Sequence, residues 1–172
     1  MELEDLMAAR FSVRHYADRP IEDDKLQHII EAGTTLAPTG ANRQPQRIYV
    51  LKSTEAIAKI RGLVRCAFDA PVVLMVTYST DEEWKNPFDA SIAAGAQDAS
   101  IAGTHMMLEA WKLGIGSCWV NLFDVAEVHE AFGLPAEETL LFLMPLGYAA
   151  EGAKPSHLHS ESRPISEMVE EL

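Results

Sequence analysis

The sequence predicts an α+β or α/β fold in which helices cover a sheet of four or five strands. Helical and strand patterns alternate along the chain, and no hairpin signal such as Asn-Gly joins one strand to the next. Residues 71–78 form an uninterrupted apolar run, which is the pattern of a strand that is buried on both faces. These patterns leave the order of the strands open.

The long helix that we expect over residues 89–113 has an unusual composition, because it is rich in Ala and Gly. Small side chains let backbones approach closely, so we expect this helix at the centre of the fold or at a subunit contact. We expect the other helices over 3–9, 23–35, 53–65 and 125–132, with a weak helical end at 165–170. We expect the strands over 48–51, 71–78, 117–120 and 140–148.

The chain has 172 residues, a formal net charge of −12 and 48% hydrophobic residues, which predicts a single domain, residues 1–172, with a sizeable core. The negative charge argues against nucleic acid and anionic membranes as partners, because both are negatively charged. No run reaches the roughly 18 apolar residues of a membrane span, and the N-terminus lacks the apolar region of a signal peptide. The two cysteines, Cys66 and Cys118, lack CxxC spacing and fit a reducing compartment. We therefore expect a soluble, cytoplasmic protein.

Basic residues are scarce, so Arg10 and Arg14 on either side of Ser12 form the first candidate site. Guanidinium groups match the geometry of phosphate oxygens, so the two arginines and the hydroxyl predict a phosphate cradle. The alternative is that Arg10 only complements the end of the preceding helix, where a cation stabilises by about 0.3–1 kcal/mol. The spacing alone does not separate these two interpretations.

The loop at residues 38–46 is the second candidate site, because it holds amide side chains in a restrained turn. Gly40 lets the backbone approach a ligand, while Asn42 and Gln44 offer donors and acceptors. An ordinary turn between a helix and a strand uses the same residue types. Taken alone, the loop favours the ordinary turn.

The third candidate is the segment 113–124, which contains two glycines at positions 114 and 116. A Rossmann phosphate loop follows a strand and needs a third glycine, so we expect these glycines to end the long helix instead.

His157 and His159 lack carboxylate or cysteine partners, so we expect a surface tail and no metal site. Cys118 lies in an apolar strand, which predicts a buried small residue and not a nucleophile. The chain has no Gly-x-Ser-x-Gly elbow and no Walker loop, so hydrolase and NTPase functions lack a starting residue.

Taken together and in order, these stretches resemble the nitroreductase family of flavoproteins. The resemblance covers nearly the whole chain, and five motifs in register make a chance match improbable. The matching segments are Arg10-Phe11-Ser12-Val13-Arg14 (family pattern R-x-S-x-R), residues 37–45 (A-P-[ST]-[GS]-x-N-x-Q-P), the strand beginning at 70–73, the helix and turn at 98–117, and the closing segments 146–148 and 162–164.

The resemblance implies a three-layer α/β/α sandwich of the α+β class with a central, mostly antiparallel sheet. It also implies a homodimer with flavin mononucleotide (FMN) at the subunit interface. Arg10, Ser12 and Arg163 would hold the phosphate, Arg14 would lie near the ribityl chain or the pyrimidine edge, and a backbone N–H near Leu122 would reach the flavin N5. The loop residues would contact the flavin of the partner subunit. The cofactor-binding set implied in this way is Arg10, Phe11, Ser12, Arg14, Pro38, Thr39, Gly40, Asn42, Trp119, Val120, Asn121, Leu122 and Arg163.

The activity implied by the resemblance is electron transfer from NADH or NADPH to a small-molecule acceptor, such as a nitroaromatic or a quinone, in a ping-pong cycle. The flavin carries the chemistry, so no side chain is expected to act as an obligatory acid or base. Two alternatives stay open. One is a module that stores or senses FMN without turnover, and the other is an interaction domain without a cofactor, whose Ala/Gly-rich helix serves dimerisation only.

The chain departs from the family pattern at several positions. Glu161 stands where a second basic phosphate ligand often occurs, and Gln46 stands where Trp often follows Gln-Pro. Residues 104–105 replace a frequent Gln-Asn, and residues 121–122 replace a common acidic or glycine pair at the flavin edge. The insert that often covers the substrate pocket is reduced to the loop 84–88. The sequence therefore leaves the acceptor open.

Overall fold

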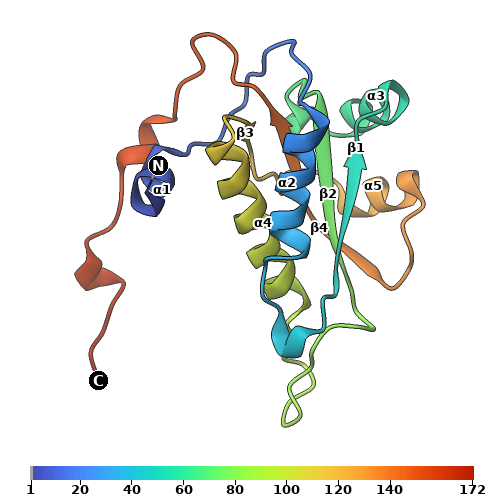
Figure 1. Ribbon diagram of the computed structural model, residues 1–172. Coiled ribbons are helices and arrows are strands. Elements are labelled where there is room, and N and C mark those ends of the chain that lie inside the picture. The colour runs from blue at the N-terminus through green and yellow to red at the C-terminus, as the bar shows by residue number, and fades with distance from the viewer. Residues whose placement is uncertain (1) are drawn as a thin grey trace.

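A four-stranded antiparallel sheet forms the middle layer of the structure, and helices cover both of its faces (Figure 1). The computed structural model describes residues 2–172. The strand order is β1-β2-β4-β3, so β2 and β4 are central and the short β3 lies at an edge. This arrangement confirms the predicted α+β class with three layers. The strands are β1 Gln46–Leu51, β2 Val72–Ser79, β3 Gly116–Ser117 and β4 Glu138–Gly147.

Strand β2 carries apolar side chains into two separate cores, one on each face of the sheet. Met75 packs into the core on the side of one pair of helices, and Leu74 packs into the core on the other side. Met75 lies opposite Tyr49 in β1 and Leu143 in β4, so it is paired on both edges. The uninterrupted apolar run at 71–78 is therefore a strand buried on both faces, as predicted.

Helices α2 (Asp23–Thr34) and α4 (Gly95–Lys112) pack against each other over one face of the sheet (Figure 1). The close packing requires glycine at Gly103, because a Cβ there would lie 2.4 Å from the ring of Phe142 and 2.7 Å from that of Trp119. Small side chains thus let α4 sit at the centre of the fold, which is one of the two positions expected from its composition.

Helices α3 (Thr54–Leu63) and α5 (Val125–Phe132) cover the opposite face of the sheet. Each begins at a side-chain cap: Ser53 and Asp124 accept hydrogen bonds from the backbone N–H three residues later, at 3.1 and 3.0 Å. Such caps satisfy amides that have no partner within the helix. The predicted position of both helices is confirmed.

Helix α4 begins at Gly95, whereas the sequence predicted a start at residue 89, so that expected boundary was wrong. The Asp89 carboxylate accepts hydrogen bonds from the backbone N–H of Ser91 at 3.0 Å and from its hydroxyl at 2.6 Å. These local bonds compete with helical ones and hold a turn instead. At the other end Gly114 adopts a φ of 77° and its N–H donates to the Trp111 carbonyl at 3.0 Å, so this glycine ends the helix as predicted.

Helix α1 (Leu3–Ala9) lies beside the C-terminal segment, and both lie away from the sheet (Figure 1). This helix forms where the sequence predicts it. The C-terminal segment carries two short 3₁₀ turns, η3 (His157–Ser160) and η4 (Ile165–Glu167), so the weak helical end expected at 165–170 is only one turn.

The strand expected at 117–120 is shorter in the structure, since only Gly116–Ser117 form β3 and Val120 makes an isolated bridge to β4. Among residues 2–172, no helix is both long and apolar enough to cross a membrane.

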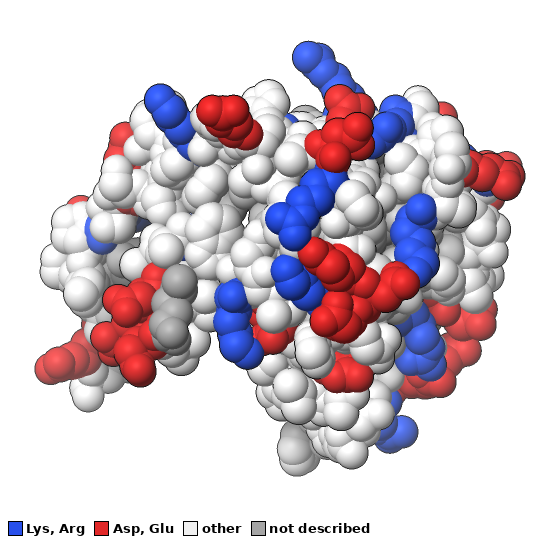
Figure 2. All heavy atoms as spheres, turned by 45° about the horizontal axis from the view of Figure 1, so that its top comes forward, with Lys and Arg blue, Asp and Glu red and all other residues white. Residues whose placement is uncertain are grey.

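Acidic and basic side chains are interspersed on the face of the molecule shown in Figure 2. Exposed ion pairs such as Arg19–Glu22 and Lys52–Asp23 contribute to this mixture. Pairs of this kind stabilise a fold by only about 0–1 kcal/mol each, because water screens them. The local lining of a cavity, more than the net charge of −12, therefore decides which ligand it attracts.

We predict that Gly103→Ala destabilises the fold by about 1–2 kcal/mol, because overpacking against Phe142 and Trp119 outweighs the gain in helix propensity. Urea unfolding measures the change. The matched control is Gly62→Ala in α3, where a Cβ would meet nothing within 4 Å. This control should be neutral or stabilising by about 0.5 kcal/mol. Equal effects of the two substitutions would contradict the packing argument.

Candidate functional site

The chain after α1 runs as an extended segment beside β3, and this positions the first predicted site. The backbone N–H of Val13 donates to the Ser117 carbonyl at 2.9 Å, and the Val13 side chain is fully buried. Gly116 permits this approach, since a Cβ there would lie 2.5 Å from a Val13 methyl group. Side chains alternate along an extended chain, so Ser12 and Arg14 lie on the side opposite Val13.

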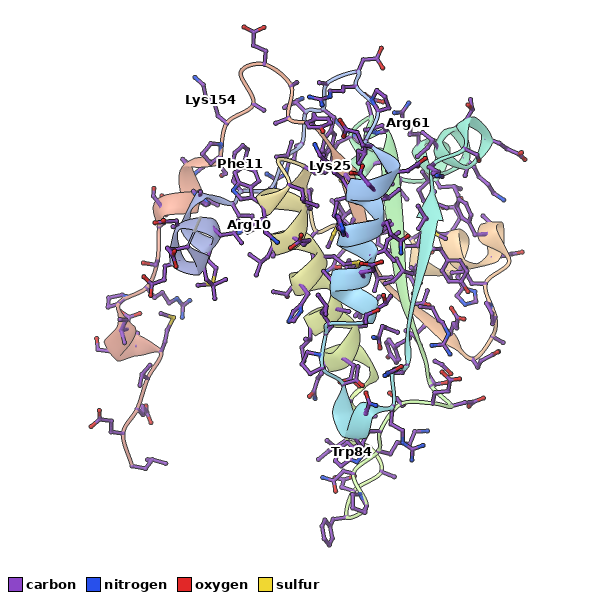
Figure 3. All side chains as sticks on the ribbon, in the orientation of Figure 1. Arg10, Phe11, Lys25, Arg61, Trp84 and Lys154 are labelled. Atoms are coloured by element: carbon purple, nitrogen blue, oxygen red, sulfur yellow. The ribbon has the colours of Figure 1, made fainter. Side chains whose placement is uncertain are left out.

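A basic cavity of about 230 Å³ opens between this segment and the C-terminal segment. Phe11 forms one wall and packs edge-to-face against Trp111 of α4, with the ring centroids 5.1 Å apart. Figure 3 shows Arg10 and Phe11 beside the C-terminal part of α4. Among the described residues that line the cavity there is no Asp or Glu, although the chain has 26 acidic residues. The lining residues are Arg10, Phe11, Ser12, Arg14, Ser156, Leu158 and His159.

A second cavity of about 220 Å³ adjoins the first, and Arg14 borders both. Its lining is largely apolar. The Trp119 ring stacks on the Phe142 ring, with the ring centroids 3.6 Å apart. Its Nε1–H donates to the Asn121 side-chain oxygen at 3.2 Å. The four residues 119–122 that were expected along a flat ring line this cavity together. The complete lining is Arg14, Cys66, Phe68, Cys118, Trp119, Val120, Asn121 and Leu122.

The thiol of Cys118 lies in the wall of the second cavity but is poorly suited to act as a nucleophile. Burial raises the pKa of the Cys118 thiol above its usual value, and the nearby Arg14 charge opposes this only in part. A thiol with a raised pKa is protonated at neutral pH and therefore weakly nucleophilic. Cys118 is 3% exposed, so the prediction of a buried small residue is confirmed.

The predicted loop residues Pro38, Thr39, Gly40 and Asn42 lie at the opposite end of α4 from the basic cavity. The backbone N–H of Gly40 donates to the buried carboxylate of Asp98 at 2.9 Å, in the first turn of α4. Gly40 also packs against Trp84, and Figure 3 shows Trp84 beyond that end of the helix. Asp98 and Trp111, which packs on Phe11, are 13 residues apart in α4, so the helix separates the loop from the basic cavity by about 20 Å. Within one chain, therefore, the loop does not join Arg10 and Ser12.

The backbone of this loop is more strained than that of an ordinary turn. Ala41, Asn42 and Gln44 have φ values of 48°, 55° and 52°, in the left-handed region that favours glycine. Such conformations cost energy and are concentrated at functional sites. The structure thus adds support to the loop as a binding element, which the residue types alone did not give.

Arg163 was predicted to share the phosphate site with Arg10 and Ser12, but it lines a neighbouring cavity of about 350 Å³. The two cavities meet at Leu158, which lines both. Glu161 also lines the cavity of Arg163. The C-terminal segment therefore brings a different side chain, His159, to the arginine pair.

Six lining residues were not predicted from the sequence as parts of the site: Ser156, Leu158, His159, Cys66, Phe68 and Cys118. His159 was weighed only as a metal ligand, and the scarcity of cations that singled out Arg10 and Arg14 would have applied to it as well. Phe68 carries no signal in the sequence. In the structure its φ of 53° places it in a strained turn. No local pattern brings residues 66–68 to the segment 118–122.

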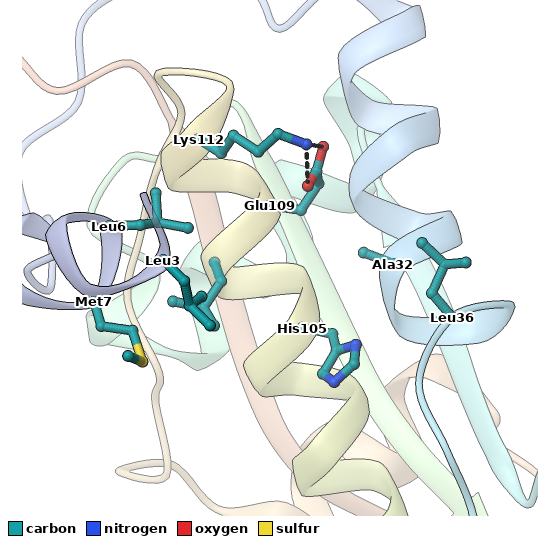
Figure 4. A pocket seen from close by; sticks show the side chains of 9 residues that line it. Leu3, Leu6, Met7, Ala32, Leu36, His105, Glu109 and Lys112 are labelled. Atoms are coloured by element: carbon teal, nitrogen blue, oxygen red, sulfur yellow. Dashed lines mark hydrogen bonds and ion pairs between the residues drawn. The ribbon is translucent and has the colours of Figure 1, made fainter. Parts of the chain in front are cut away.

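An apolar groove of about 530 Å³ separates α1 from α2 and α4 (Figure 4). Leu3, Leu6 and Met7 form one wall, and Leu36 lies across from them at the end of α2. Leu3 and Leu36 are 60% and 70% exposed. Contiguous exposed apolar surface of this kind is typical of interaction sites.

The fold and the two cavities define a three-layer α+β protein in which a basic cavity and a largely apolar one meet at Arg14. Comparison with known proteins gives the class a name. Residues 7–69 and 61–148 match the Nitroreductase family, and the chain belongs to this family.

Similar proteins cover almost the full length of the chain. A nitroreductase family protein from Clostridium difficile 630 is 35% identical, with a TM-score of 0.90 over 99% of this chain and 98% of its own. An NADH dehydrogenase from Thermus thermophilus is 30% identical over 86% of this chain and 87% of its own length. A protein from Desulfovibrio desulfuricans, named as a nitroreductase and solved in complex with FMN, is 26% identical with a TM-score of 0.81, over 100% of this chain and 98% of its own.

Tyr16 anchors the arginine-bearing segment to the sheet. Its hydroxyl lies 2.8 Å from the Val13 carbonyl and 3.1 Å from the Pro145 carbonyl, and burial raises the pKa of Tyr16 far above its ordinary value. The folded chain therefore keeps a proton that the unfolded chain releases above about pH 10. This contribution to stability is complete below that pH and is lost as the pH rises.

We predict that Tyr16→Phe lowers the free energy of unfolding by about 1–2 kcal/mol at pH 7, because a buried carbonyl loses its donor. Above about pH 10 the difference between wild type and variant should shrink, since only the wild type has the hydroxyl that ionises on unfolding. Urea unfolding of both proteins from pH 7 to pH 11 measures this. A difference that stays constant over the range would contradict the assignment.

Proposed function

We propose that the chain is an oxidoreductase that uses FMN to pass electrons from NADH or NADPH to a small oxidised acceptor. One observation carries the proposal: Arg14 borders a basic cavity and a largely apolar cavity at the same time. FMN has a phosphate at one end and a wide, flat ring at the other, so its two ends match the two cavities in charge and in shape. A ligand without both features would leave one of them unused.

Relatives support both the cofactor and the donor. The Desulfovibrio desulfuricans protein was solved with FMN, and the Thermus thermophilus protein is named an NADH dehydrogenase. A protein from Methanothermobacter thermautotrophicus, 26% identical over 88% of this chain and 79% of its own length, carries the alternative names NADH dehydrogenase and NAD(P)H nitroreductase. These names agree on a nicotinamide donor and differ on the acceptor. The proposal accordingly leaves the acceptor at the level of a nitroaromatic, a quinone or a similar flat molecule.

The side chains of the two cavities would bind and orient FMN. Arg10 and Ser12 hold the phosphate, and Arg14 lies between the phosphate and the ring. Residues 119–122 form the surface on which the flavin ring would lie. Stacking on Phe142 fixes the Trp119 side chain within this surface. Arg163 adds positive charge from the neighbouring cavity. FMN itself supplies the ring that accepts and returns a hydride, so no side chain acts as an obligatory acid or base.

The proposal includes a homodimer, because most of the length of α4 separates the strained loop from the basic cavity of its own chain. A second copy would bring the loop of the partner subunit to the flavin. It would also cover the apolar groove beside α1 and the exposed apolar side chains of the C-terminal segment. Burial of such surface stabilises a dimer by about 25 cal/mol for each Å² removed from water, before the costs of association.

We predict that the double variant Arg10→Ala, Ser12→Ala binds FMN at least about 100-fold more weakly than the wild type. Each substitution removes a hydrogen bond to a charged group, worth about 1.5–3 kcal/mol. Quenching of FMN fluorescence measures the affinity. Arg19→Ala, which removes an arginine from a surface ion pair, is the matched control and should leave binding unchanged. FMN affinity that survives the double substitution would overturn the placement of the phosphate.

We predict that NADH or NADPH alone bleaches the absorbance of bound FMN under anaerobic conditions, because donor and acceptor use the same cavity in turn. Stopped-flow spectroscopy follows the bleaching, and a quinone added afterwards should restore the oxidised spectrum. FMN that is bound but never bleached by either nucleotide would favour a module that stores or senses the flavin.

A further inference from the structure

The basic cavity is built from two segments that are far apart in the sequence. Arg10, Ser12 and Arg14 come from the chain after α1, and His159 comes from the short turn η3 near the C-terminus. His159 is the one described lining residue outside the N-terminal segment that is able to carry a positive charge. The C-terminal segment therefore brings an imidazole to a pair of guanidinium groups.

The orientation of the His159 ring follows from its contact with α1. Its Nε2 lies 3.1 Å from the backbone carbonyl of Ala8, which is in the last turn of the helix. A carbonyl oxygen only accepts hydrogen bonds, so Nε2 carries the proton and donates it. This contact occupies one ring nitrogen and leaves Nδ1 for a ligand. When protonated at both nitrogens, the ring is a double donor that bridges α1 and an anion.

The surroundings of His159 favour an anion. The groups that line the cavity with it are two guanidiniums, two hydroxyls and two apolar side chains, and the lining contains no carboxylate. Glu161, where the family pattern often has a basic phosphate ligand, lines the neighbouring cavity. Two guanidinium groups that line one cavity without a carboxylate repel each other, and an anion between them relieves this repulsion.

We infer that His159 is a ligand of the phosphate group in this site and supplies the basic contact that Glu161 does not. The inference rests on the proposed function, since the phosphate is that of FMN. The imidazole binds the phosphate together with Arg10 and Ser12, while its second nitrogen stays on the Ala8 carbonyl. The C-terminal segment is thereby fixed against α1 by the cofactor as well as by the protein.

A purely structural role for His159 predicts a different outcome from a ligand role. If the ring only satisfies the Ala8 carbonyl, its removal affects FMN and riboflavin alike, because riboflavin has the same ring without the phosphate. If His159 binds the phosphate, its removal weakens FMN and leaves riboflavin unchanged. The comparison of the two flavins therefore separates the roles without measuring activity.

We predict that His159→Ala raises the Kd for FMN about tenfold, which is the loss of one charge-assisted hydrogen bond, and leaves the Kd for riboflavin unchanged. His159→Lys, which restores a cation, should recover part of the FMN affinity. Inorganic phosphate should compete with FMN for the wild type and less well for His159→Ala. Fluorescence titration of the full-length chain provides all of these values.

The matched control is His157→Ala, since His157 lies in the same turn but does not line the cavity. It should bind both flavins like the wild type. If His159→Ala binds FMN within twofold of the wild type, or weakens riboflavin equally, the role of His159 is overturned while the proposed function stands. If the wild type binds no FMN, the proposed function is overturned, and the role of His159 falls with it.

Discussion

The pairing of the segment after α1 with the edge strand β3 is the interaction on which the candidate site depends. Val13 enters the core only because Gly116 has no side chain, and the Val13 N–H bond to Ser117 fixes the register. That register places Ser12 and Arg14 on the outer side and aligns Arg14 with both cavities. A shift by one residue would bury the polar side chains and expose Val13, because side chains alternate along an extended chain.

The length of α4 imposes the second constraint. The helix is straight and central, with Phe11 and the basic cavity at its C-terminal end and the strained loop at its N-terminal end. The loop and the basic cavity are thus held about 20 Å apart within one chain. A second copy resolves this separation in the proposed function, and the exposed apolar groove offers the surface for it. The helix that gives the core its packing thereby also keeps the loop apart from the basic cavity of its own chain.

Local charge, and not the net charge of −12, governs the chemistry of the site. The acidic side chains lie elsewhere on the surface, and those lining the basic cavity are arginine, serine, histidine and apolar residues. A small cavity without carboxylates is thus present on a chain of negative net charge, and salt screens charges that lie farther away than about 10 Å. Glu161 lines the adjacent cavity, whereas His159 lines the same cavity as the arginine pair.

The sequence by itself determined the class of the fold, the buried strand at 71–78, the helices that follow Ser53 and Asp124, and the segments proposed for the site. These features depend on local periodicity, on caps and on short motifs, so they can be read along the chain. Only the tertiary structure decided that α4 starts at Gly95, that residues 38–42 lie far from Arg10, and that His159 and not Arg163 lines the cavity of Arg10. Each of these depends on which distant segments pack together, and that is settled by burial and by hydrogen bonds between residues that no local pattern relates.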